Sequence, residues 1–365
     1  MENGKPVRVL IVDDSKLVRS ILRDILDHDG GITVVGEAGS GQEAVDQTPR
    51  LRPDLIIMDI QMPGMDGFTA TEQIMAYHPT PILIFSSAID KSEQYTSFKA
   101  ISLGALDVMS KPDITGDGFA EIAATLIRKV KTLARITVIF HIRGKLKHPA
   151  EGAPPAPGGT VRHAPAPRQR PVFAAVPPVD LVVIGASTGG PSTLEHLLGA
   201  FPSSFPVGIC VVQHISRGFV GSLTEWLSGK VRMKVVVAAD GDEIRPGHVY
   251  FAPDDAQMLV APGRRIQLRP DLPPWGEHKP AVNHLFASAG ECYGSRVIGV
   301  ILTGMGDDGA QGLKTIHARG GVTIAQNQST SLIFGMPRSA IELGAVSRIL
   351  PLEEIPGDIM SLLEE

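Results

Sequence analysis

Short apolar runs alternate with amphipathic stretches in the first third of the chain. The runs at 7–12, 55–58 and 81–85 are uninterrupted and rich in branched residues, which is typical of parallel strands buried on both faces. Two further strands are predicted at 32–36 and 105–109. Between these runs, apolar positions recur every three or four residues and predict helices over 17–26, 41–47, 66–77, 92–103 and 119–133. Five such units in series predict a doubly wound (βα)5 domain with helices on both faces of a parallel sheet.

A second α/β pattern begins near residue 180. Apolar runs at 181–184, 206–213 and 297–302 predict further buried strands. The first and the last of these runs lead into glycine-rich turns, and helical stretches follow at 192–198 and 310–318. We therefore expect a second α/β domain that is also built on a parallel sheet.

A basic, proline-rich segment separates the two patterns. Residues 128–170 contain ten Lys or Arg against one acid, and residues 149–178 contain nine prolines. Such a composition, without hydrophobic periodicity, is typical of a semi-rigid linker. The chain is therefore predicted to consist of a first domain at 5–130, a basic Pro-rich linker at 131–178 and a second domain at 179–365.

Composition narrows the class of protein. The chain has 365 residues, of which 43% are hydrophobic and 20% charged, as in globular proteins. No apolar run approaches the ~20 residues of a membrane-spanning helix and the N-terminus has no signal-peptide pattern, so we do not expect an integral membrane protein. Two cysteines, Cys210 and Cys292, fit a cytoplasmic location and exclude a cysteine-rich zinc module. The formal net charge of −5 argues against nucleic acid as a partner.

Polar residues stand at the ends of several first-domain strands. Asp13 and Asp14 end the first strand, Asp59 the third and Ser86 the fourth, and Lys111 follows the fifth. Three carboxylates that converge at one sheet edge favour a hard divalent cation such as Mg²⁺. A lysine and a hydroxyl beside them suit the oxygens of a phosphoryl group that is transferred to a carboxylate. Each residue alone is more often a cap or turn residue, but together they favour a site.

The same residues belong to motifs that resemble the receiver domain of two-component response regulators. The motifs are VDDS at 12–15, MDIQMPGMDG at 58–67, FSS at 85–87 and SKP at 110–112. The resemblance implies that Asp59 is the phosphoacceptor and that a histidine kinase is the phosphodonor. It further implies that Mg²⁺, needed for phosphorylation, is held by Asp13, Asp14, Asp59 and the backbone carbonyl of Gln61.

Two further positions are implied to form the phosphorylation switch. Ser86 corresponds to the switch hydroxyl and Lys111 to the lysine that contacts the phosphate. Val108 departs from the pattern, because many receivers have an aromatic residue there that rotates during activation. The departure leaves the coupling between phosphorylation and the rest of the chain open.

The turn after the run at 181–184 carries a candidate nucleophile. Residues 185–191 read GASTGGP between a predicted strand and a predicted helix, which is the context of a nucleophile elbow that would expose Ser187. Glycine amides near a helix N-terminus can also face a developing oxyanion. A phosphate-binding glycine loop is the competing interpretation, although the turn lacks the Walker lysine and the G-x-G-x-x-G spacing.

A serine nucleophile needs a base and an acid that holds the base. His214 ends the strand predicted at 206–213, so it can lie beside Ser187 in a parallel sheet. Asp308, in the turn after 297–302, could accept from His214. Capping or core-edge roles are the alternatives for His214, and Asp308 or Asp307 could cap the next helix. The other histidines considered are His248 and His284, which compete as bases, and His278 and His317, whose surroundings are surface-like.

Five segments resemble the catalytic domain of chemotaxis protein-glutamate methylesterases. They are GASTGG at 185–190, VVQHIS at 211–216, LTGMGDDG at 302–309, GVTIAQNQ at 321–328 and FGMPRSA at 334–340. By position in these motifs, Ser187 corresponds to the nucleophile, His214 to the base and Asp308 to the orienting acid. The order Ser–His–Asp differs from the Ser–Asp–His order of α/β-hydrolases.

With the receiver placed first, the whole chain resembles a phosphorylation-regulated methylesterase and glutaminase. The resemblance implies hydrolysis of glutamate methyl esters on methyl-accepting chemoreceptors and deamidation of selected receptor glutamines, which gives adaptation in chemotaxis. No cofactor is expected for the ester chemistry. The unphosphorylated receiver is expected to pack over the Ser187 cleft, and phosphorylation of Asp59 to bias the chain towards an open state.

Departures from the family pattern leave other functions open. The segment PAVNHLF at 280–286 has Ala281 and Asn283 where the family commonly has Ser and Asp, which bears on the substrate more than on the chemistry. The alternatives are an esterase-type response regulator of a non-chemotaxis pathway and a phosphorylation-gated scaffold with an idle catalytic centre. A DNA-binding response regulator is disfavoured, because no helix-turn-helix pattern follows the receiver.

Overall fold

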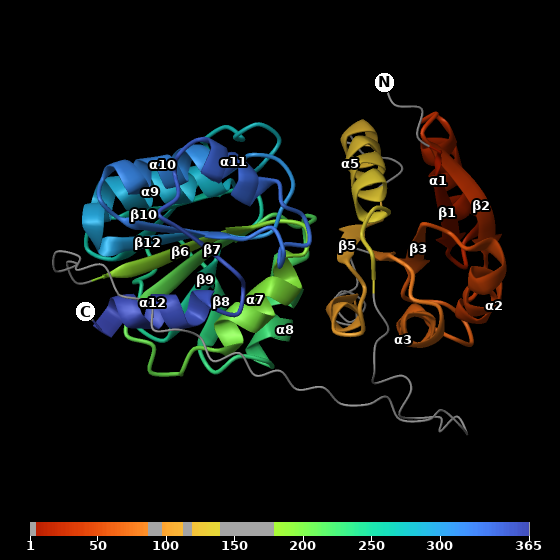
Figure 1. Cartoon of the computed structure of the whole chain (residues 1–365), viewed down its shortest axis with the longest axis horizontal. Coiled ribbons are helices and arrows are strands. Elements are labelled where there is room, and N and C mark those ends of the chain that lie inside the picture. Colours follow the sequence, from red (N-terminus) through yellow and green to blue (C-terminus); the bar gives the residue numbers. More distant parts are fainter. Residues whose placement is uncertain (1–4, 87–96, 112–118, 139–178, 365) are drawn as a thin grey trace, which may run out of the picture.

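The first domain is a five-stranded sheet with helices on both faces (Figure 1). The computed structural model describes residues 5–86, 97–111, 119–138 and 179–364. Of the predicted helix at 92–103, residues 97–103 are described; 97–101 are helical, and a turn follows. The other elements are β1 (Val7–Val12), α1 (Lys16–Asp27), β2 (Ile32–Ala38), α2 (Gly41–Leu51), β3 (Leu55–Asp59), α3 (Gly67–Tyr77), β4 (Ile82–Ser86), β5 (Asp107–Ser110) and α5 (Phe119–Leu133).

All five strands are parallel, in the order β2-β1-β3-β4-β5. The strand order reverses between β1 and β3, and a doubly wound sheet holds its ligands at such a switch point. Polar caps begin the helices that flank this point. Ser15 accepts the N–H of Val18 at the start of α1, and Asp66 accepts the N–H of Thr69 at the start of α3. The predicted (βα)5 fold is thus confirmed.

The second domain is built on a seven-stranded parallel sheet in the order β14-β13-β12-β6-β7-β9-β8. A separate antiparallel hairpin, β10-β11, lies outside it. The strands are β6 (Leu181–Ala186), β7 (Gly208–Gln213), β8 (Lys234–Val237), β9 (His248–Phe251), β10 (Gln257–Ala261), β11 (Arg265–Arg269), β12 (Val297–Ile301), β13 (Val322–Gln326) and β14 (Arg348–Leu350). The helices are α7 (Gly190–Gly199), α8 (Val220–Ser228), α9 (Val282–Tyr293), α10 (Ala310–Ala318), α11 (Met336–Glu342) and α12 (Ile355–Glu364), with a 3₁₀ turn at Gly294–Arg296.

The long apolar runs predicted the three central strands of this sheet, whereas the two strands on either side of them were not predicted. The runs at 181–184, 206–213 and 297–302 contain most of β6, β7 and β12, which lie side by side. Strands β8 and β14 have only four and three residues, too few for periodicity to reveal them. The predicted strands thus include β6 and both of its neighbours in the sheet, β12 and β7.

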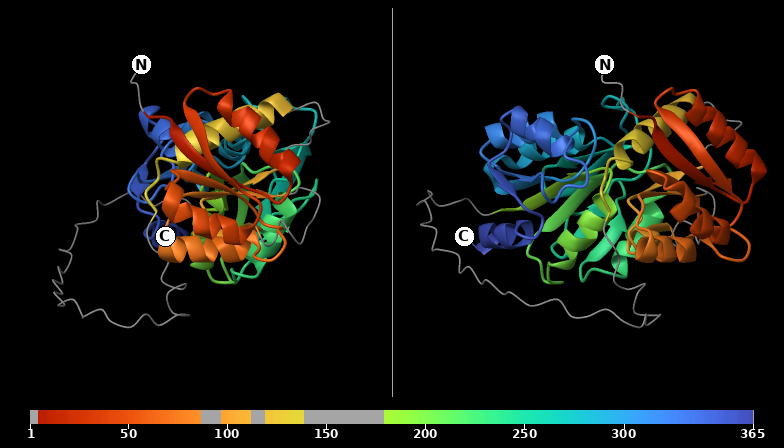
Figure 2. Two further views of the ribbon diagram at one scale, coloured as in Figure 1. Left: turned by 90° about the vertical axis from the view of Figure 1, so that its right-hand side faces the viewer. Right: turned by 45° about the vertical axis from the view of Figure 1, so that its right-hand side comes forward.

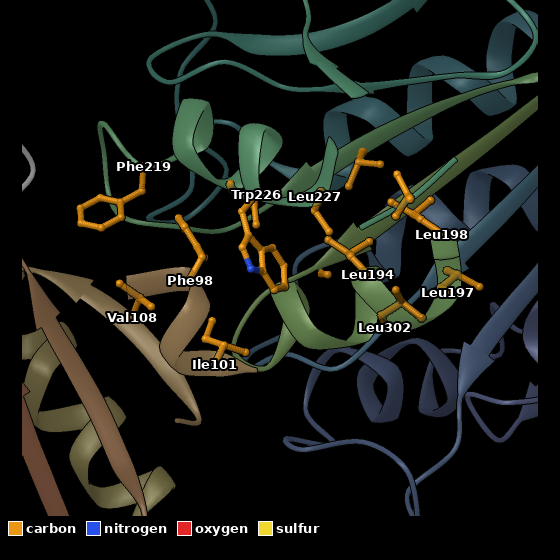
Figure 3. Close-up of a cluster of buried hydrophobic side chains, with 14 of the residues drawn as sticks. Phe98, Ile101, Val108, Leu194, Leu197, Leu198, Phe219, Trp226, Leu227 and Leu302 are labelled. Atoms are coloured by element: carbon orange, nitrogen blue, oxygen red, sulfur yellow. The ribbon is translucent and has the colours of Figure 1, made fainter. Parts of the chain in front are cut away.

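An apolar cluster joins the two domains. Phe98 and Val108 of the first domain lie beside Phe219 and Trp226 of the second, and all four are buried (Figure 3). The ring of Phe98 lies 6.2 Å from that of Phe219, edge to face, and 6.0 Å from that of Trp226. Figures 1 and 2 show α5 and β5 on the side of the first domain that faces the second. In the described part of the chain, no helix is long and apolar enough to cross a membrane.

Candidate active site

Ser187 lies directly after β6, the central strand of the second sheet. Its N–H donates to the carbonyl of Thr303 (3.0 Å), and its own carbonyl accepts from Gln213 Nε2 (2.8 Å). The turn enters α7 at Gly190, where an added Cβ would lie 1.8 Å from Gln213 Oε1. The sharp strand-to-helix turn expected from the sequence is therefore present, and small residues are needed to close it.

His214 follows β7, the strand that pairs with β6. Its N–H donates to the carbonyl of Ala186, at 2.9 Å, so Ser187 and His214 stand at the ends of adjacent strands. The side chain of His214 is 8% exposed. The predicted neighbourhood of serine and histidine thus follows from the sheet order.

Asp308 reaches His214 from the turn after β12. Its Oδ2 lies 2.8 Å from His214 Nε2 and accepts the N–H of Val282 at 2.7 Å, and its Oδ1 accepts the N–H of Asn283 at 2.9 Å. Burial raises the pKa of Asp308, but the hydrogen bonds from His214, Asn283 and Val282 outweigh it and hold the pKa below its ordinary value. Asp308 is therefore a carboxylate at neutral pH.

The charge on Asp308 determines the tautomer of His214. A carboxylate only accepts, so the proton between the two side chains must sit on Nε2 of His214. In the neutral imidazole the lone pair is then on Nδ1. This atom is buried and has no hydrogen-bond partner within the described residues. The arrangement leaves Nδ1 able to take a proton from a hydroxyl.

The loop after β12 packs directly against the candidate nucleophile. A Cβ added to Gly304 would lie 2.8 Å from the Cβ of Ser187 and 2.2 Å from the sulfur of Met336. Thr303 Oγ1 donates to the carbonyl of Thr188 at 3.0 Å. This loop and the Ser187 turn are thereby fixed against each other.

The other histidines lie in different surroundings. The ring of His248 stacks on Tyr250 and that of His284 meets Trp275 at its edge. His317 contacts Ser347 and Thr323 beside β13. For His278 the expected surface-like surroundings are wrong, because its ring is half-buried and stacks on that of His214. Sequence spacing could not reveal this contact, since the two residues are on separate elements.

Neither aspartate of the second site caps helix α10. The N-cap is Gly309, with a φ of +97°, and it has no side chain that could cap the helix. The capping alternatives for Asp307 and Asp308 are therefore wrong. The carboxylate of Asp308 instead forms hydrogen bonds with His214, Val282 and Asn283.

A cluster of carboxylates occupies the switch point of the first sheet. Ligand atoms of Asp13, Asp14 and Asp59 all lie within 4.8 Å of one another, and Asp13 and Asp59 are buried. Lys111 Nζ lies 2.8 Å from Asp13 Oδ2 and 2.9 Å from Asp59 Oδ2. Burial lowers the pKa of Lys111, but Asp13 and Asp59 outweigh it, so the pKa is raised and the lysine is cationic. Oxygen ligands of this kind fit Mg²⁺.

The remaining predicted residues of the first site lie close by in the fold. Ser86 is buried at the end of β4, and its carbonyl accepts the N–H of Lys111 at 2.8 Å. Gln61 is exposed just after β3. The loop that carries Asp13 and Asp14, here called the acidic loop, is held by a basic side chain that was not predicted from the sequence. Arg19 Nη1 donates to the backbone carbonyls of both aspartates.

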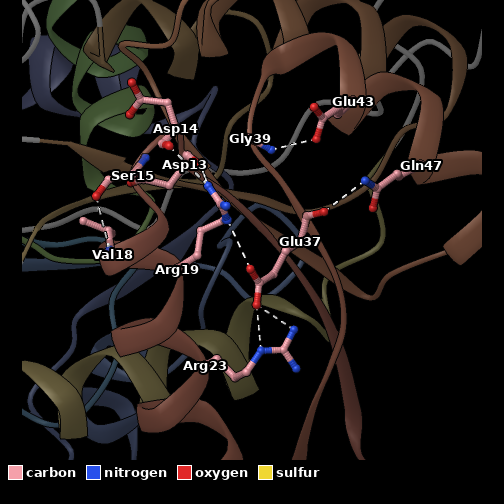
Figure 4. A network of polar contacts seen from close by, with 10 residues as sticks. All are labelled: Asp13, Asp14, Ser15, Val18, Arg19, Arg23, Glu37, Gly39, Glu43 and Gln47. Carbon is pink, nitrogen blue, oxygen red and sulfur yellow. Dashed lines mark hydrogen bonds and ion pairs between the residues drawn. The ribbon is translucent and has the colours of Figure 1, made fainter.

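Arg19 is itself held in a network behind the acidic loop (Figure 4). Its Nε lies 3.1 Å from Glu37 Oε2, and Arg23 pairs with the other oxygen of Glu37. Burial raises the pKa of Glu37, but the two arginines outweigh it and hold the pKa below its usual range. An arginine one turn into the first helix is the signal that could have indicated this brace.

Comparison with known proteins identifies the chain. A family model described as CheB methylesterase matches residues 182–359, and one described as response regulator receiver domain matches residues 9–120. Protein-glutamate methylesterase/protein-glutamine glutaminase 1 of Syntrophus aciditrophicus is 42% identical over 356 residues, which is 98% of each chain. The chain belongs to this methylesterase/glutaminase family. A second member, from Anaeromyxobacter dehalogenans, is 40% identical over 358 residues, or 98% of this chain and 97% of its own.

A solved structure of the same family resembles the second half of the methylesterase. The crystal structure of the Thermotoga maritima CheB methylesterase catalytic domain is 39% identical, with a TM-score of 0.49. The match covers 50% of this chain and 98% of that one.

Receiver-domain residues reach the rim of the candidate site. Lys129 in α5 lies 3.3 Å from the hydroxyl of Thr188, the residue after the candidate nucleophile, and also pairs with Asp107 in β5. The N–H of Ser110 donates to Ser216 Oγ at 3.1 Å. The receiver domain therefore touches the segments that carry Ser187 and His214.

The two departures from the family pattern at 280–286 are buried. Ala281 donates its N–H to Gln257 Oε1 (2.7 Å), and Asn283 Oδ1 accepts the N–H of Gly312 (2.7 Å) in the first turn of α10. Asn283 also supplies a backbone N–H to Asp308. Both residues therefore act through internal packing and hydrogen bonds.

Proposed function

We propose that this methylesterase is a phosphorylation-regulated serine esterase that acts on chemoreceptors. It would hydrolyse glutamate methyl esters and deamidate selected glutamines, in keeping with the names of its relatives. The observation that carries the proposal is the hydrogen bond between Asp308 and His214, which leaves Nδ1 of His214 without a partner among the described residues, next to the strand end that bears Ser187. The two free cysteines fit a cytoplasmic location.

In the proposed reaction His214 Nδ1 takes the proton of Ser187 Oγ while Nε2 stays bonded to Asp308. The oxygen of Ser187 forms a bond to the ester carbonyl carbon, and the bond to the methoxy oxygen then breaks. The proton on Nδ1 passes to the methoxy group, which leaves as methanol. Water, deprotonated by the same nitrogen, hydrolyses the acyl-enzyme to the free glutamate and Ser187. With a glutamine substrate the same steps release ammonia.

Asp59 is proposed as the phosphoacceptor of the receiver domain, with a histidine kinase as phosphodonor. Asp13, Asp14 and Asp59, with the Gln61 carbonyl, would hold Mg²⁺, which when bound offsets the negative charge of the phosphoryl oxygens. Lys111 and Ser86 would bind those oxygens after transfer. Such binding would draw Lys111 away from its present ion pairs with Asp13 and Asp59.

We infer that the receiver domain restrains the esterase in the unphosphorylated state. The supporting contacts are Lys129 with Thr188, Ser110 with Ser216 and the packing of Phe98 on Trp226. Phosphorylation of Asp59 would act through β4 and β5, since Ser86 ends β4 and Lys111 follows β5. Val108, in β5, lies in the apolar interface, so coupling at this position would occur through packing.

Methanol release from methylated chemoreceptor membranes tests the proposal. The wild-type chain should release methanol faster with a small phosphodonor than without it, and Ser187→Ala should release none above background in either condition. Asp59→Asn should keep the basal rate and lose the response to the phosphodonor. Methanol release that does not depend on Ser187 would overturn the esterase assignment.

The alternatives give different outcomes in the same assay. A scaffold with an idle centre would release no methanol from receptor membranes or from a soluble glutamate methyl ester. An esterase of another pathway would cleave the soluble ester in a Ser187-dependent manner and leave receptor membranes untouched.

A further inference from the structure

A second imidazole lies flat against that of the proposed base. The rings of His214 and His278 are stacked, with centroids 3.8 Å apart and planes only 7° from parallel. His278 stands in the connection between β11 and α9, outside the Ser187, His214 and Asp308 set. Two histidines stacked beside a carboxylate affect each other's protonation, so the contact bears on how His214 works.

One hydrogen bond does not fix an imidazole ring. The bond from Nε2 to Asp308 places one atom of the His214 ring, and the ring can still tilt about that atom. A flat partner at van der Waals distance fixes the plane of the ring. Together the two contacts determine where Nδ1 lies, and Nδ1 is the atom that must meet the serine proton.

We propose that His278 is a positioning residue, whose ring holds the plane of His214 so that Nε2 stays on Asp308 and Nδ1 is presented to the nucleophile. The inference rests on the proposed function, because it assigns a role to the base of that reaction. His278 does not exchange a proton with the substrate in this scheme.

The backbone of His278 is held firmly enough for such a role. Its N–H donates to the carbonyl of Trp275 (3.1 Å), and its carbonyl accepts from the N–H of Trp275 (3.0 Å). Gln257 Nε2 also donates to the His278 carbonyl, at 3.4 Å, while Gln257 Oε1 accepts from Ala281 at 2.7 Å. Gln257 is fully buried, so it ties His278 to the start of α9.

The start of α9 also holds the other partner of His214. The N–H groups of Val282 and Asn283 bind the two oxygens of Asp308. A single segment, 278–283, thus sets both the carboxylate that bonds to His214 and the ring that covers it. The two contacts are positioned together rather than independently.

The charge state of His278 suits the stacking. Burial and the nearby His214 lower the pKa of His278 to about 4, so its ring is neutral at neutral pH. When His214 takes the serine proton, the imidazolium faces a neutral π-system, which attracts a cation. A charged neighbour would repel that intermediate.

Three variants of the full chain, assayed with phosphodonor on receptor membranes, test the role. His278→Ala removes the flat partner, and we expect kcat to fall about 10- to 100-fold with KM changed less than about threefold. His278→Phe keeps a flat, neutral ring and should retain kcat within about fivefold. His278→Leu keeps the bulk without the flat ring and should resemble His278→Ala.

A spectroscopic measurement distinguishes positioning from mere stability. In chains with ¹⁵N-labelled histidine, His214 should be protonated on Nε2 in the wild type and His278→Phe, and show mixed tautomers in His278→Ala. Equal kcat for His278→Ala and wild type, or equal rescue by Phe and Leu, would overturn the proposal. Ser187-dependent methanol release by the wild type keeps the esterase assignment intact in either case, so the two hypotheses fail separately.

Discussion

Charge and tautomer are determined at the scale of single residues. Asp308 accepts three hydrogen bonds, and this is why it stays ionised although it is buried. Its charge in turn leaves the proton on Nε2 of His214 and the lone pair on Nδ1. In the receiver domain, Lys111 keeps its charge by the same rule, because two carboxylates lie within 3 Å of its amine.

The buried neutral state of His278 predicts a pH effect on stability. Its pKa is lowered from 6.5 to about 4 in the folded chain, so between these values the unfolded chain binds the proton and the folded chain does not. The free energy of unfolding should therefore fall as pH drops from 6.5 towards 4, by roughly 2 kcal/mol. In His278→Phe this contribution is lost, so urea unfolding at pH 7 and pH 4.5 should give a smaller difference than in the wild type. An unchanged difference would contradict the assignment.

Asn283 predicts a second effect at this scale. Its side chain accepts the N–H of Gly312, so Asn283→Ala leaves that buried donor unpaired and should cost about 1–2 kcal/mol of unfolding free energy. Asn283→Asp is the matched control, because a carboxylate can accept the same bond at the start of α10. Thermal unfolding measures both variants. Equal unfolding midpoints for Asn283→Ala and the wild type would refute a stabilising role for the bond from Asn283 to Gly312.

At the scale of elements, the sites are made by strand ends and the turns that follow them. Residues Ser187, His214 and Asp308 come from the turns after β6, β7 and β12, which are neighbours in the sheet. Asp13 and Asp59 stand at the ends of β1 and β3 in the same way. Parallel strands bring such turns to one edge, so residues far apart in the chain meet there.

The turn after β12 should tolerate no side chain at Gly304. In Gly304→Ala the new methyl group would collide with Met336 and with Ser187, and Ser187 would have to move. We expect a loss of kcat of roughly 100-fold, since a displacement of about 1 Å is enough for that. The matched control is Gly199→Ala at the end of α7, where the methyl group meets nothing within 4 Å. Methanol release measures both, and full activity of Gly304→Ala would disprove the close contact.

At the scale of the whole molecule, two domains with separate sites share one apolar interface. Phe98 packs between Phe219 and Trp226, and Lys129 reaches Thr188 beside Ser187. Apolar burial supplies most of the free energy of such an interface, whereas its exposed ion pairs supply little. The balance between closed and open states should therefore depend chiefly on the aromatic contacts.

Removal of the central aromatic ring should release the esterase. Phe98→Ala should raise the methanol release without phosphodonor about tenfold, because a loss of about 1.4 kcal/mol from the closed state shifts its population by that factor. The rate with phosphodonor should stay near that of the wild type.

The matched control is the exposed pair of Arg128 and Glu277, which joins the same domains at 2.9 Å. Arg128→Ala should change the basal rate less than threefold, because exposed ion pairs contribute about 0–1 kcal/mol. A basal rate that rises with Arg128→Ala and not with Phe98→Ala would show that charge, rather than packing, holds the domains together.

The sequence by itself determined the two parallel sheets, their central strands and the residues that end those strands. Uninterrupted apolar runs indicate buried strands, and a polar residue that ends such a run must lie at a sheet edge. Motifs around Asp59, Ser187, His214 and Asp308 added the family. These signals are local, so one sequence suffices to read them.

Only the tertiary structure decided how the site residues are held. The tautomer of His214, the stacking of His278 and the packing of Phe98 on Trp226 all depend on residues that are far apart in the sequence. No local pattern records such pairs, because the distance between them is determined by sheet order and domain packing. For this reason His278 was expected at the surface, and its contact with His214 became visible only in the folded chain.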